Sequence, residues 1–298
     1  MRVRRIWRVL RQLPLIGDLL ALAAEQVLVV WQSRYGLLAR VSAASGVSRR
    51  KRTPPLIVSL TTYEPRIGKV HLCIESLLRQ DLKPDAIFLW LADDLPPELV
   101  SSALRRQERR GLQIRFHANL RSFMKIVPTL EEYPDAVIVT CDDDMIYPHD
   151  WLDGLYRSYV EEPEYIHCHR AHLITRLTDG EIEDYERWEY LAPGVQGPSN
   201  LLFPTGVGGV LYPPGSLADE CTDAEIFLAL CPTQDDVWLK AMAVRQGTLA
   251  KKVAPDSREF ETIRGTQKQA LSYINTGEGG RNDAQVRAVF ERYGINVV

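Results

Sequence analysis

The sequence predicts an α/β protein with a mixed, mostly parallel sheet and helices on both faces. Short apolar runs rich in β-branched residues alternate with stretches of helical periodicity, which is the pattern of strands joined by crossover helices. One run, residues 136–141, is apolar at nearly every position. Strands of a parallel sheet are covered on both faces, so this run is predicted to be a central strand.

The strands are assigned in chain order from apolar runs that polar or turn-forming residues end. The first ends in the polar loop 61–66, the second at Asp93 and Asp94, and the run 136–141 at three consecutive aspartates. A later run is closed by two prolines, which cannot continue a ladder. The predicted strands are 56–60, 86–91, 113–116, 136–141, 165–170 and 208–212.

The predicted helices fill the intervals between these strands. A Pro-Pro-Glu sequence suits the first turn of a helix over 96–109, because proline at the first helical position gives up no needed N–H. The other helices are predicted over 69–79, 123–132, 151–160, 235–246 and 283–293, and residues 179–199 are predicted to be mostly loop.

The first 52 residues differ from the rest of the chain in charge. They contain eleven Lys or Arg and two acids, a net charge of +9, whereas the whole chain carries −3 and residues 53–298 therefore −12. A basic segment is attracted to anionic surfaces. Residues 53–298 have no basic stripe interleaved with aromatics, so nucleic acid is not an expected partner. We therefore expect an arm with a linker over 1–52 and a folded domain over 53–298.

The apolar stretch 13–31 is interrupted by Pro14, Gly17, Asp18 and Glu25. A membrane-spanning helix needs roughly 20 largely uncharged residues, so these acids argue against one. Two alternatives stay open. The arm is either an amphipathic helix that associates with a membrane surface through residues 1–40, or a helix that packs on the domain or on a partner.

Three adjacent carboxylates, Asp142, Asp143 and Asp144, follow the strand predicted at 136–141. Like charges so close raise one another's pKa or recruit a cation. Polar residues also follow strands 56–60 and 86–91, and ligands of open α/β sheets bind at the carboxyl ends of strands. We therefore favour a divalent cation with oxygen ligands over a solvated acidic loop or an Asp that caps the turn into Tyr147 and Pro148. An aspartate-nucleophile phosphatase is disfavoured, because Ile146 occupies the position of its Thr.

Two further clusters carry candidate chemistry. Asp235 and Asp236 begin the helix predicted at 235–246, where one of them or Thr233 is the expected N-cap. The loop 205–209 is rich in glycine, which permits a close approach of backbone to ligand or a positive φ. It lacks the strand-before, helix-after context of a dinucleotide fingerprint, so NAD binding is rejected.

Taken together, several segments resemble bacterial glycosyltransferases of the GT-A fold that are similar to family 2. The resemblance covers residues 55–298 and implies that 53–298 is a catalytic domain. It implies a nucleotide-diphospho-sugar donor, preferably a UDP-sugar, a hydroxyl acceptor on a glycan or glycolipid, and inversion at the anomeric carbon. The segments are 58–63, 74–80, 83–85, 139–144, 208–214, 235–239 and 282–285.

The resemblance also implies roles for particular residues. Mn²⁺ or Mg²⁺ would bridge the donor phosphates, with Asp144 as its ligand and with Asp142 and Asp143 contacting the ribose or the metal. Asp236 would be the general base, with Asp235 as the alternative, because the family usually has Glu-Asp where this chain has Asp-Asp. Donor-binding positions complete the set: Thr61, Tyr63, Arg66, Asp93, Asp94, Lys125, Gly208 and Gly209.

Each donor-binding assignment has a structural alternative. Asp93 or Asp94 reads the nucleotide or caps the helix near Pro96, and Lys125 lies near the nucleotide or in solvent on a helix. Tyr63 stacks on the base and Arg66 meets a phosphate, or both belong to a turn loop. Gly208 and Gly209 form a wall beside the donor sugar or a tight turn.

The location of the protein follows from its cysteines and its implied donor. The five cysteines are scattered, odd in number and without a CxxC pair, so we expect buried thiols in a reducing compartment. Because such donors are made in the cytosol, a cytoplasmic protein, peripheral on the inner face of the membrane, is expected. The rival interpretation is a non-catalytic subunit that binds nucleotide-sugar or glycan in a polysaccharide assembly system.

Overall fold

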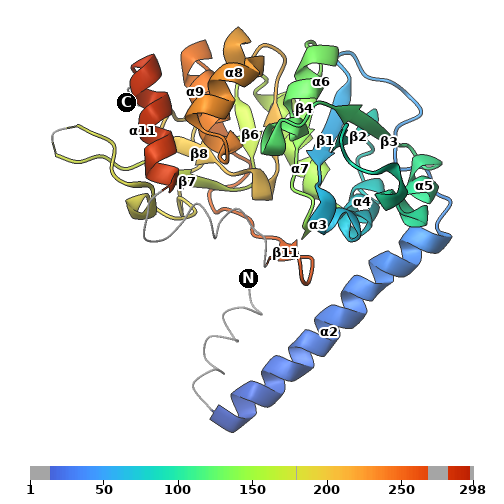
Figure 1. The fold of residues 1–298 in the computed structure, drawn as a ribbon. Coiled ribbons are helices and arrows are strands. Elements are labelled where there is room, and N and C mark those ends of the chain that lie inside the picture. The colour runs from blue at the N-terminus through green and yellow to red at the C-terminus, as the bar shows by residue number, and fades with distance from the viewer. Residues whose placement is uncertain (1–13, 179, 268–280, 296–298) are drawn as a thin grey trace.

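A computed structural model describes residues 14–178, 180–267 and 281–295, with side chains from residue 26 onward (Figure 1). The first 13 residues of the predicted arm therefore lie outside the described part. The chain forms a central sheet with helices on both sides and a long helix, α2 (Pro14–Val41), that extends away from it.

A seven-stranded sheet confirms the predicted mixed, mostly parallel architecture. Its strand order is β10-β6-β9-β4-β1-β2-β3. Only β9 is inverted, pairing antiparallel with β4 and β6, while the other neighbours pair parallel. The predicted central strand lies in the middle of this order as β4. The bounds are β1 (Leu56–Thr61), β2 (Ala86–Ala92), β3 (Leu112–His117), β4 (Val137–Thr140), β6 (Ile166–Cys168), β9 (Val210–Tyr212) and β10 (Ala250–Lys252).

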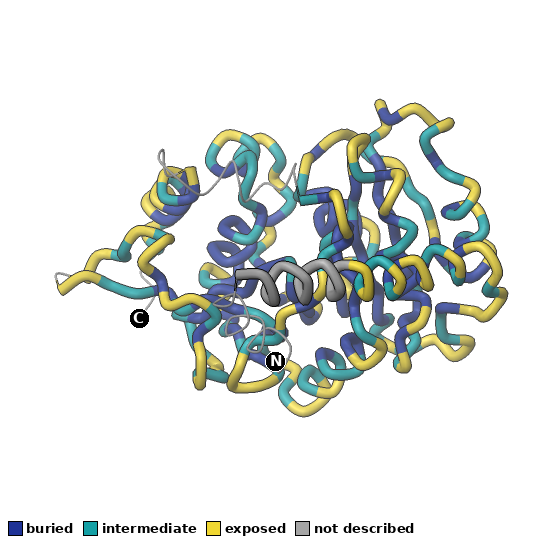
Figure 2. Tube along the Cα trace, turned by 90° about the horizontal axis from the view of Figure 1, so that it is seen from below, coloured by how far each residue is buried: buried dark blue, intermediate teal, exposed yellow. Residues whose placement is uncertain are grey.

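Alternate residues of the strands face two separate cores, as a period of two requires. In β1, Ile57 belongs to one core and Val58 to the other. The Ile57 face is covered by α6 (Val127–Glu132), α8 (Ala224–Leu230), α9 (Asp235–Gln246) and α11 (Arg281–Tyr293). The Val58 face is covered by α4 (Val70–Leu78), α5 (Ser102–Glu108) and α7 (Trp151–Glu161), and Figure 2 shows the buried residues concentrated between these layers.

Two predicted helices are each divided. The helix predicted over 96–109 is a short 3₁₀ turn, Pro97–Leu99, followed by α5, whose N-cap Ser101 accepts from the Leu104 N–H at 3.3 Å. The helix predicted over 123–132 is a 3₁₀ turn, Arg121–Lys125, followed by α6, with Pro128 in its first turn. Proline gives up an N–H and suits a new first turn better than a helix interior, so the division follows from sequence.

Several short elements were not predicted from the sequence. Two-stranded sheets pair β5 (Met145–Ile146) with β11 (Glu261–Thr262) and β7 (Ala171–Leu173) with β8 (Leu202–Pro204). A short helix, α3 (Glu64–Ile67), follows β1. Segments of two to four residues are too short to show periodicity, and their partners lie far away in sequence, so no local signal identifies them.

The apolar helix of the arm continues past Trp31 to Val41 and packs against α4 and α5 through Tyr35 and Ala39. In the part of the chain that the structure describes, no helix combines the length and the apolar character that crossing a membrane requires. The segment after α2 lies on the body, where the Gly46 N–H donates to the Arg110 carbonyl at 2.8 Å.

A buried ion pair holds these N-terminal elements together. Arg110 donates to both carboxylate oxygens of Glu75, at 2.5 and 3.1 Å, and its Nε donates to the Ala44 carbonyl at 2.9 Å. Their side chains are 3% and 0% exposed. The pair therefore joins α4, the loop after α5 and the segment that follows α2.

Replacing Arg110 with Met is expected to lower the free energy of unfolding by about 3–5 kcal/mol, because it leaves the Glu75 charge buried without its partner. Replacing both residues, as Glu75→Leu with Arg110→Met, should recover much of this loss. Urea unfolding of the three proteins measures the difference. A single variant as stable as the double variant would contradict the prediction.

Candidate functional site

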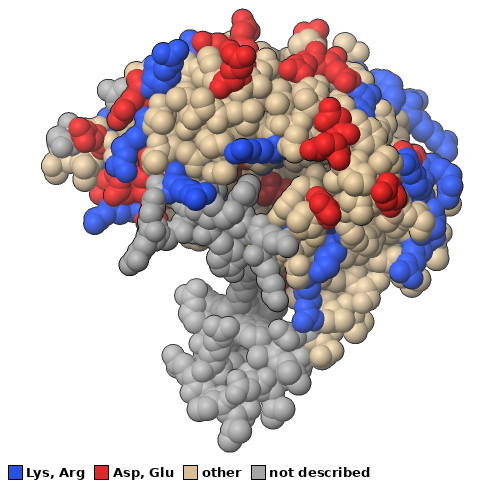
Figure 3. All heavy atoms as spheres, viewed as in Figure 1, with Lys and Arg blue, Asp and Glu red and all other residues tan. Residues whose placement is uncertain are grey.

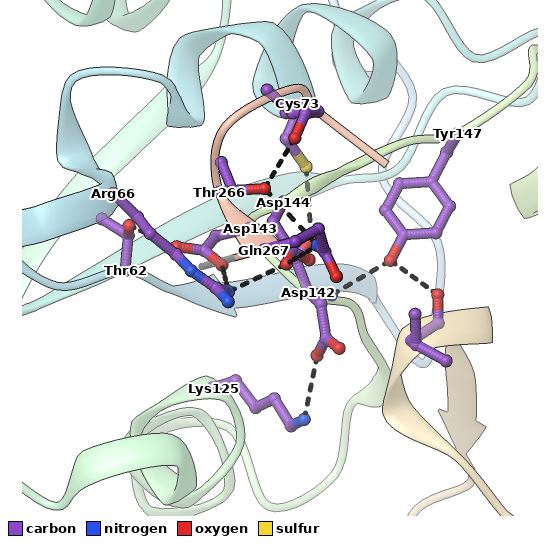
Figure 4. Close-up of polar contacts among 12 residues, drawn as sticks. Thr62, Arg66, Cys73, Lys125, Asp142, Asp143, Asp144, Tyr147, Thr266 and Gln267 are labelled. Atoms are coloured by element: carbon purple, nitrogen blue, oxygen red, sulfur yellow. Dashed lines mark hydrogen bonds and ion pairs between the residues drawn. The ribbon is translucent and has the colours of Figure 1, made fainter. Parts of the chain in front are cut away.

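The acidic run begins at Asp142, two positions after the end of β4, and is held by Thr62 in the loop after β1 and by Arg66 of α3 (Figure 4). Asp143 is buried and accepts from the Thr62 hydroxyl at 2.5 Å and from Arg66 Nη1 at 2.8 Å. Burial raises the pKa of Asp143, and Arg66 and Thr62 offset part of that increase. Both carboxylate oxygens of Asp143 therefore accept hydrogen bonds from other side chains of the protein.

Among the described residues, the side-chain contacts of Asp144 are to one of its two carboxylate oxygens. Oδ2 accepts from Gln267 Nε2 at 2.8 Å and lies 3.1 Å from Arg66 Nη1. Its backbone carbonyl accepts from the Ile263 N–H at 2.7 Å. Burial, and next the neighbouring Asp142 charge, raise the pKa of Asp144 to about 6. Its negative charge is therefore only partly neutralised.

Asp142 is fixed by its backbone and directs its side chain the other way. Its N–H donates to the Tyr147 hydroxyl at 3.0 Å, and its carbonyl accepts from the Cys73 thiol at 3.3 Å. The side chain is 31% exposed, and Oδ1 accepts from Lys125 Nζ at 3.1 Å. Figure 4 shows Lys125 and Arg66 approaching the acidic run from different sides.

Lys125 connects the acidic run to the acidic pair at the start of α9. Its Nζ lies 3.1 Å from Asp142 Oδ1 and 2.7 Å from Asp235 Oδ2. Burial lowers its pKa, but Asp142, Asp235 and Asp236 raise it further, so the pKa of Lys125 is well above its ordinary value. The alternative of a solvated helix residue is wrong, because Lys125 is buried in a 3₁₀ turn.

Asp236 is paired with a backbone donor. The Gly206 N–H donates to its Oδ1 at 3.2 Å and to its Oδ2 at 3.0 Å. Burial raises its pKa, Lys125 lowers it, and Asp235 and Asp142 raise it again, to about 7. The expectation that Asp235, Asp236 or Thr233 caps α9 is wrong. The N-cap is Gln234 without a side-chain hydrogen bond, and the two acids occupy the first turn, where the helix dipole favours them.

The glycine loop contributes to the site through a residue that the sequence analysis did not select. A Cβ on Gly206 would lie 2.6 Å from Lys125 Nζ and 3.1 Å from Asp236 Oδ1. Gly208 and Gly209 face away from these acids. A Cβ on Gly208 would meet Arg170, and a Cβ on Gly209, whose φ is +86°, would meet the Trp151 ring. A side chain at 206 would therefore displace the Lys125 ammonium group from its position between the acids.

The remaining candidates lie at the carboxyl ends of β1 and β2. The Thr61 hydroxyl donates to the Trp90 carbonyl at 2.9 Å, and the half-exposed Tyr63 ring lies 5.5 Å from the Arg66 guanidinium carbon. Asp93 and Asp94 are exposed, and neither caps a helix, since the N-cap of the turn at 97–99 is Pro96. Their predicted role toward a nucleotide stays a prediction.

The residues that the sequence analysis missed are Thr62, Gly206 and Gln267. Thr62 lies inside the polar loop 61–66 and Gly206 inside the glycine-rich loop 205–209, and the sequence predicts both loops as parts of the site. Gln267 is separated from Asp144 by 123 positions and lies in no recognisable motif. Nothing short of the tertiary structure identifies it.

The fit of a divalent cation depends on Asp142 and Asp144. Across the described ranges, no three His, Cys, Asp or Glu side chains converge into a site that could hold a metal by themselves. A nucleotide-bound Mg²⁺ or Mn²⁺ commonly uses one or two carboxylates together with substrate phosphates and water. The partly exposed Asp142 and the incompletely neutralised Asp144 fit that donor set.

No protein-family model matches the sequence, and no curated protein matches it. Among solved structures, the chain is similar to mannosyltransferase PcManGT from Pyrobaculum calidifontis in complex with GDP-Man and Mn²⁺. The two sequences are 16% identical, the match covers 91% of this chain and 79% of that chain, and the TM-score is 0.43. It is also similar to S. aureus TarS 1–349, with 12% identity, 80% and 71% covered, and a TM-score of 0.44. Similarity of this degree leaves the function to be inferred from the chain's own residues.

Replacing Asp236 with Asn is expected to stabilise the protein at neutral and alkaline pH. The pKa of Asp236 is about 7 in the folded protein against an ordinary 3.8, so ionisation opposes folding. This penalty is small near pH 4, grows as the pH rises to about 7 and is constant above that value. We expect Asp236→Asn to gain roughly 1–4 kcal/mol at pH 8.

Thermal unfolding of the wild type and Asp236→Asn at pH 8 and near pH 4 tests this prediction. Asp153→Asn, a change in a surface ion pair with Arg157, is the matched control and should leave the melting temperature nearly unchanged. A stabilisation of equal size at both pH values would show that ionisation of Asp236 is not its cause.

Proposed function

We propose that this protein is a glycosyltransferase that moves a sugar from a nucleotide-diphospho-sugar to a hydroxyl acceptor. One observation supports this most: Lys125 joins Asp142 of the acidic run to Asp235 of the acidic pair. Two acidic clusters from distant parts of the chain therefore share one edge of the sheet. Such a site offers cation binding and proton removal side by side, the two demands of this reaction.

On the donor side, Asp144 and Asp142 would hold Mn²⁺ or Mg²⁺. When bound, the cation would neutralise charge on the nucleoside diphosphate that leaves. Arg66 orients Asp143 and Asp144 through contacts of 2.8 and 3.1 Å. The preference for a UDP-sugar rests on the family resemblance, as do the roles of Tyr63, Asp93 and Asp94 toward the nucleotide.

On the acceptor side, Asp236 is the proposed general base. A base acts best when its pKa lies near the working pH, and that of Asp236 is about 7. Asp235 is engaged by Lys125 at 2.7 Å, which favours Asp236 as the acid that takes the acceptor proton. Proton removal by Asp236 as an oxocarbenium-like centre develops would give direct displacement with inversion.

The acceptor is proposed to be a glycan or glycolipid. Tyr190 is 62% exposed, yet its ring stacks on His172 at 4.8 Å and its hydroxyl accepts from Arg170 Nη2 at 2.8 Å. A held, exposed aromatic ring is suited to the apolar face of a sugar. Trp188 is buried and Tyr185 packs against it and Phe203, so these two belong to the core instead.

We further propose a cytoplasmic protein. Its five cysteines are free and buried, in keeping with a reducing compartment, and the implied donor is made there. The rival is a subunit that binds nucleotide-sugar or glycan without turnover. Favouring catalysis, the base candidate Asp236 is held by a backbone N–H and carries a pKa near neutrality, which binding alone does not require.

Release of nucleoside diphosphate from a panel of UDP- and GDP-sugars tests the proposed activity. We expect release with one donor in the presence of Mn²⁺, its loss with EDTA, and a fall of roughly 100-fold or more in Asp144→Ala, because diphosphate charge would no longer be neutralised. Asp153→Asn is the matched control and should retain activity. Binding of a donor without release would favour the non-catalytic rival, and release insensitive to EDTA would contradict the metal assignment.

The pH dependence of turnover tests the base. Asp236 must be ionised to accept a proton, so kcat/KM should rise with pH and level off above about 7. Asp236→Asn should lower the rate by about 10²–10⁴-fold and abolish this limb. Asp235→Asn removes a charge that raises the pKa of Asp236, so its limb should shift to lower pH. An unshifted limb that persists in Asp236→Asn would assign it to another group.

A further inference from the structure

One face of α2 exposes a stripe of aliphatic side chains. Val27, Val30, Leu37 and Val41 are 69%, 71%, 61% and 65% exposed. Their spacing of three, seven and four positions places them on one side of the helix. Nine large hydrophobic side chains are exposed in the described part of the molecule, and four of them lie in this stretch. We call these four residues the α2 stripe.

The charge of this face has one sign. Arg34 lies within the stripe and Arg40 beside its end, both are exposed, and residues 26–41 contain no Asp or Glu. The exposed Arg49, Arg50 and Lys51 follow in the segment after the helix. Figure 3 shows Lys and Arg gathered on the side where α2 meets the body, while both signs of charge are mixed elsewhere on the visible face.

The opposite side of α2 is attached to the body. Gln32, Tyr35 and Ala39 are buried. Gln32 Nε2 donates to the Thr262 carbonyl at 2.8 Å, and its Oε1 accepts from the Arg264 N–H at 3.1 Å. The buried side of the helix therefore faces the protein, and the stripe faces outward.

We propose that the α2 stripe is a docking surface for an anionic lipid bilayer. The four aliphatic side chains enter the apolar boundary, and the guanidinium groups of Arg34 and Arg40 lie among the lipid phosphates. A second copy of the chain fits less well. Two parallel α2 stripes would oppose Arg34 to Arg34 with no acid among residues 26–41 to offset the charges, and the repeat is shorter than coiled coils need.

Docking would also orient the site. Gln32 is bonded to Thr262 of β11, and Ile263 and Gln267 follow that strand. The Ile263 N–H donates to the Asp144 carbonyl at 2.7 Å, and Gln267 donates to the Asp144 carboxylate. In Figure 1, α2 runs past the sheet edge where α3 and β11 lie. A helix on the bilayer would thus hold the acidic edge near lipid, which points to a lipid-linked acceptor. That consequence rests on the proposed function, whereas the docking surface does not.

Co-sedimentation of the full chain with vesicles tests the surface. We expect binding to vesicles of phosphatidylcholine mixed with phosphatidylglycerol, weaker binding to phosphatidylcholine alone, and weakening by salt. The variant Val30→Ser/Leu37→Ser should bind at least about tenfold less, since it removes apolar surface from the stripe. Val160→Ser, an equally exposed valine of α7, is the matched control and should bind like the wild type.

Two further proteins separate the possible outcomes. Arg34→Gln/Arg40→Gln should lose most of the preference for anionic vesicles, and Asp144→Ala should bind vesicles like the wild type even if it fails to release nucleotide. The proposal is overturned if the wild type does not sediment with anionic vesicles, or if the stripe variant binds equally well. It is also overturned if light scattering shows a dimer that the stripe variant dissociates, because a second copy would then cover the stripe.

Discussion

The contact of Lys125 with Asp142 and Asp235 is the interaction on which the site depends. Five carboxylates, Asp142–Asp144 and Asp235–Asp236, gather at one sheet edge, and burial of like charges is costly without counter-charge. Arg66 forms ion pairs with Asp143 and Asp144, while Lys125 forms ion pairs with Asp142 and Asp235. Among the described residues, these two cations face five carboxylates, so the cluster retains three negative charges when all are ionised. Burial raises the pKa values of Asp144 and Asp236, and the neighbouring carboxylates raise them further.

The imbalance is also what makes the site useful in the proposed reaction. A cluster neutralised completely by its own cations would have no affinity for a divalent ion and no reason to take a proton. Here the residual charge is divided between two places: Asp144 near the acidic run, and Asp236 near the glycine loop. The protein accepts a loss of stability at both positions, as functional sites commonly do.

The scaffold positions these groups with elements from the whole chain. Asp142–Asp144 follow the central strand β4, Lys125 belongs to a 3₁₀ turn before α6, and Asp236 is in the first turn of α9. Gly206 brings its N–H to Asp236 because it has no side chain to collide with Lys125. The segment 261–267 reaches Asp144 from the C-terminal part of the chain and is itself held by Gln32 of α2. Helix α2 is therefore connected to the site through this segment.

The sequence by itself determined the fold class, six of the seven strands of the central sheet and the candidate acids, but it missed the edge strand β10. Apolar runs ending in Asp142–Asp144 and in Asp93-Asp94 indicate buried strands with polar exits, and carboxyl ends of parallel strands share an edge by geometry. Periodicity also placed α9 at its observed bounds, but it missed the divisions near Ser101 and Pro128, where caps and proline override helical propensity.

Only the tertiary structure decided which groups contact each of the acids. Whether Lys125 is solvated or buried, whether Gly206 or Gly208 meets the acids, and whether Gln267 reaches Asp144 depend on contacts between residues far apart in sequence. Such contacts leave no periodic or spacing signal, because each involves one side chain rather than a face of a helix or strand. Local patterns specify which surfaces are buried, and the packing of those surfaces then selects which charges become neighbours.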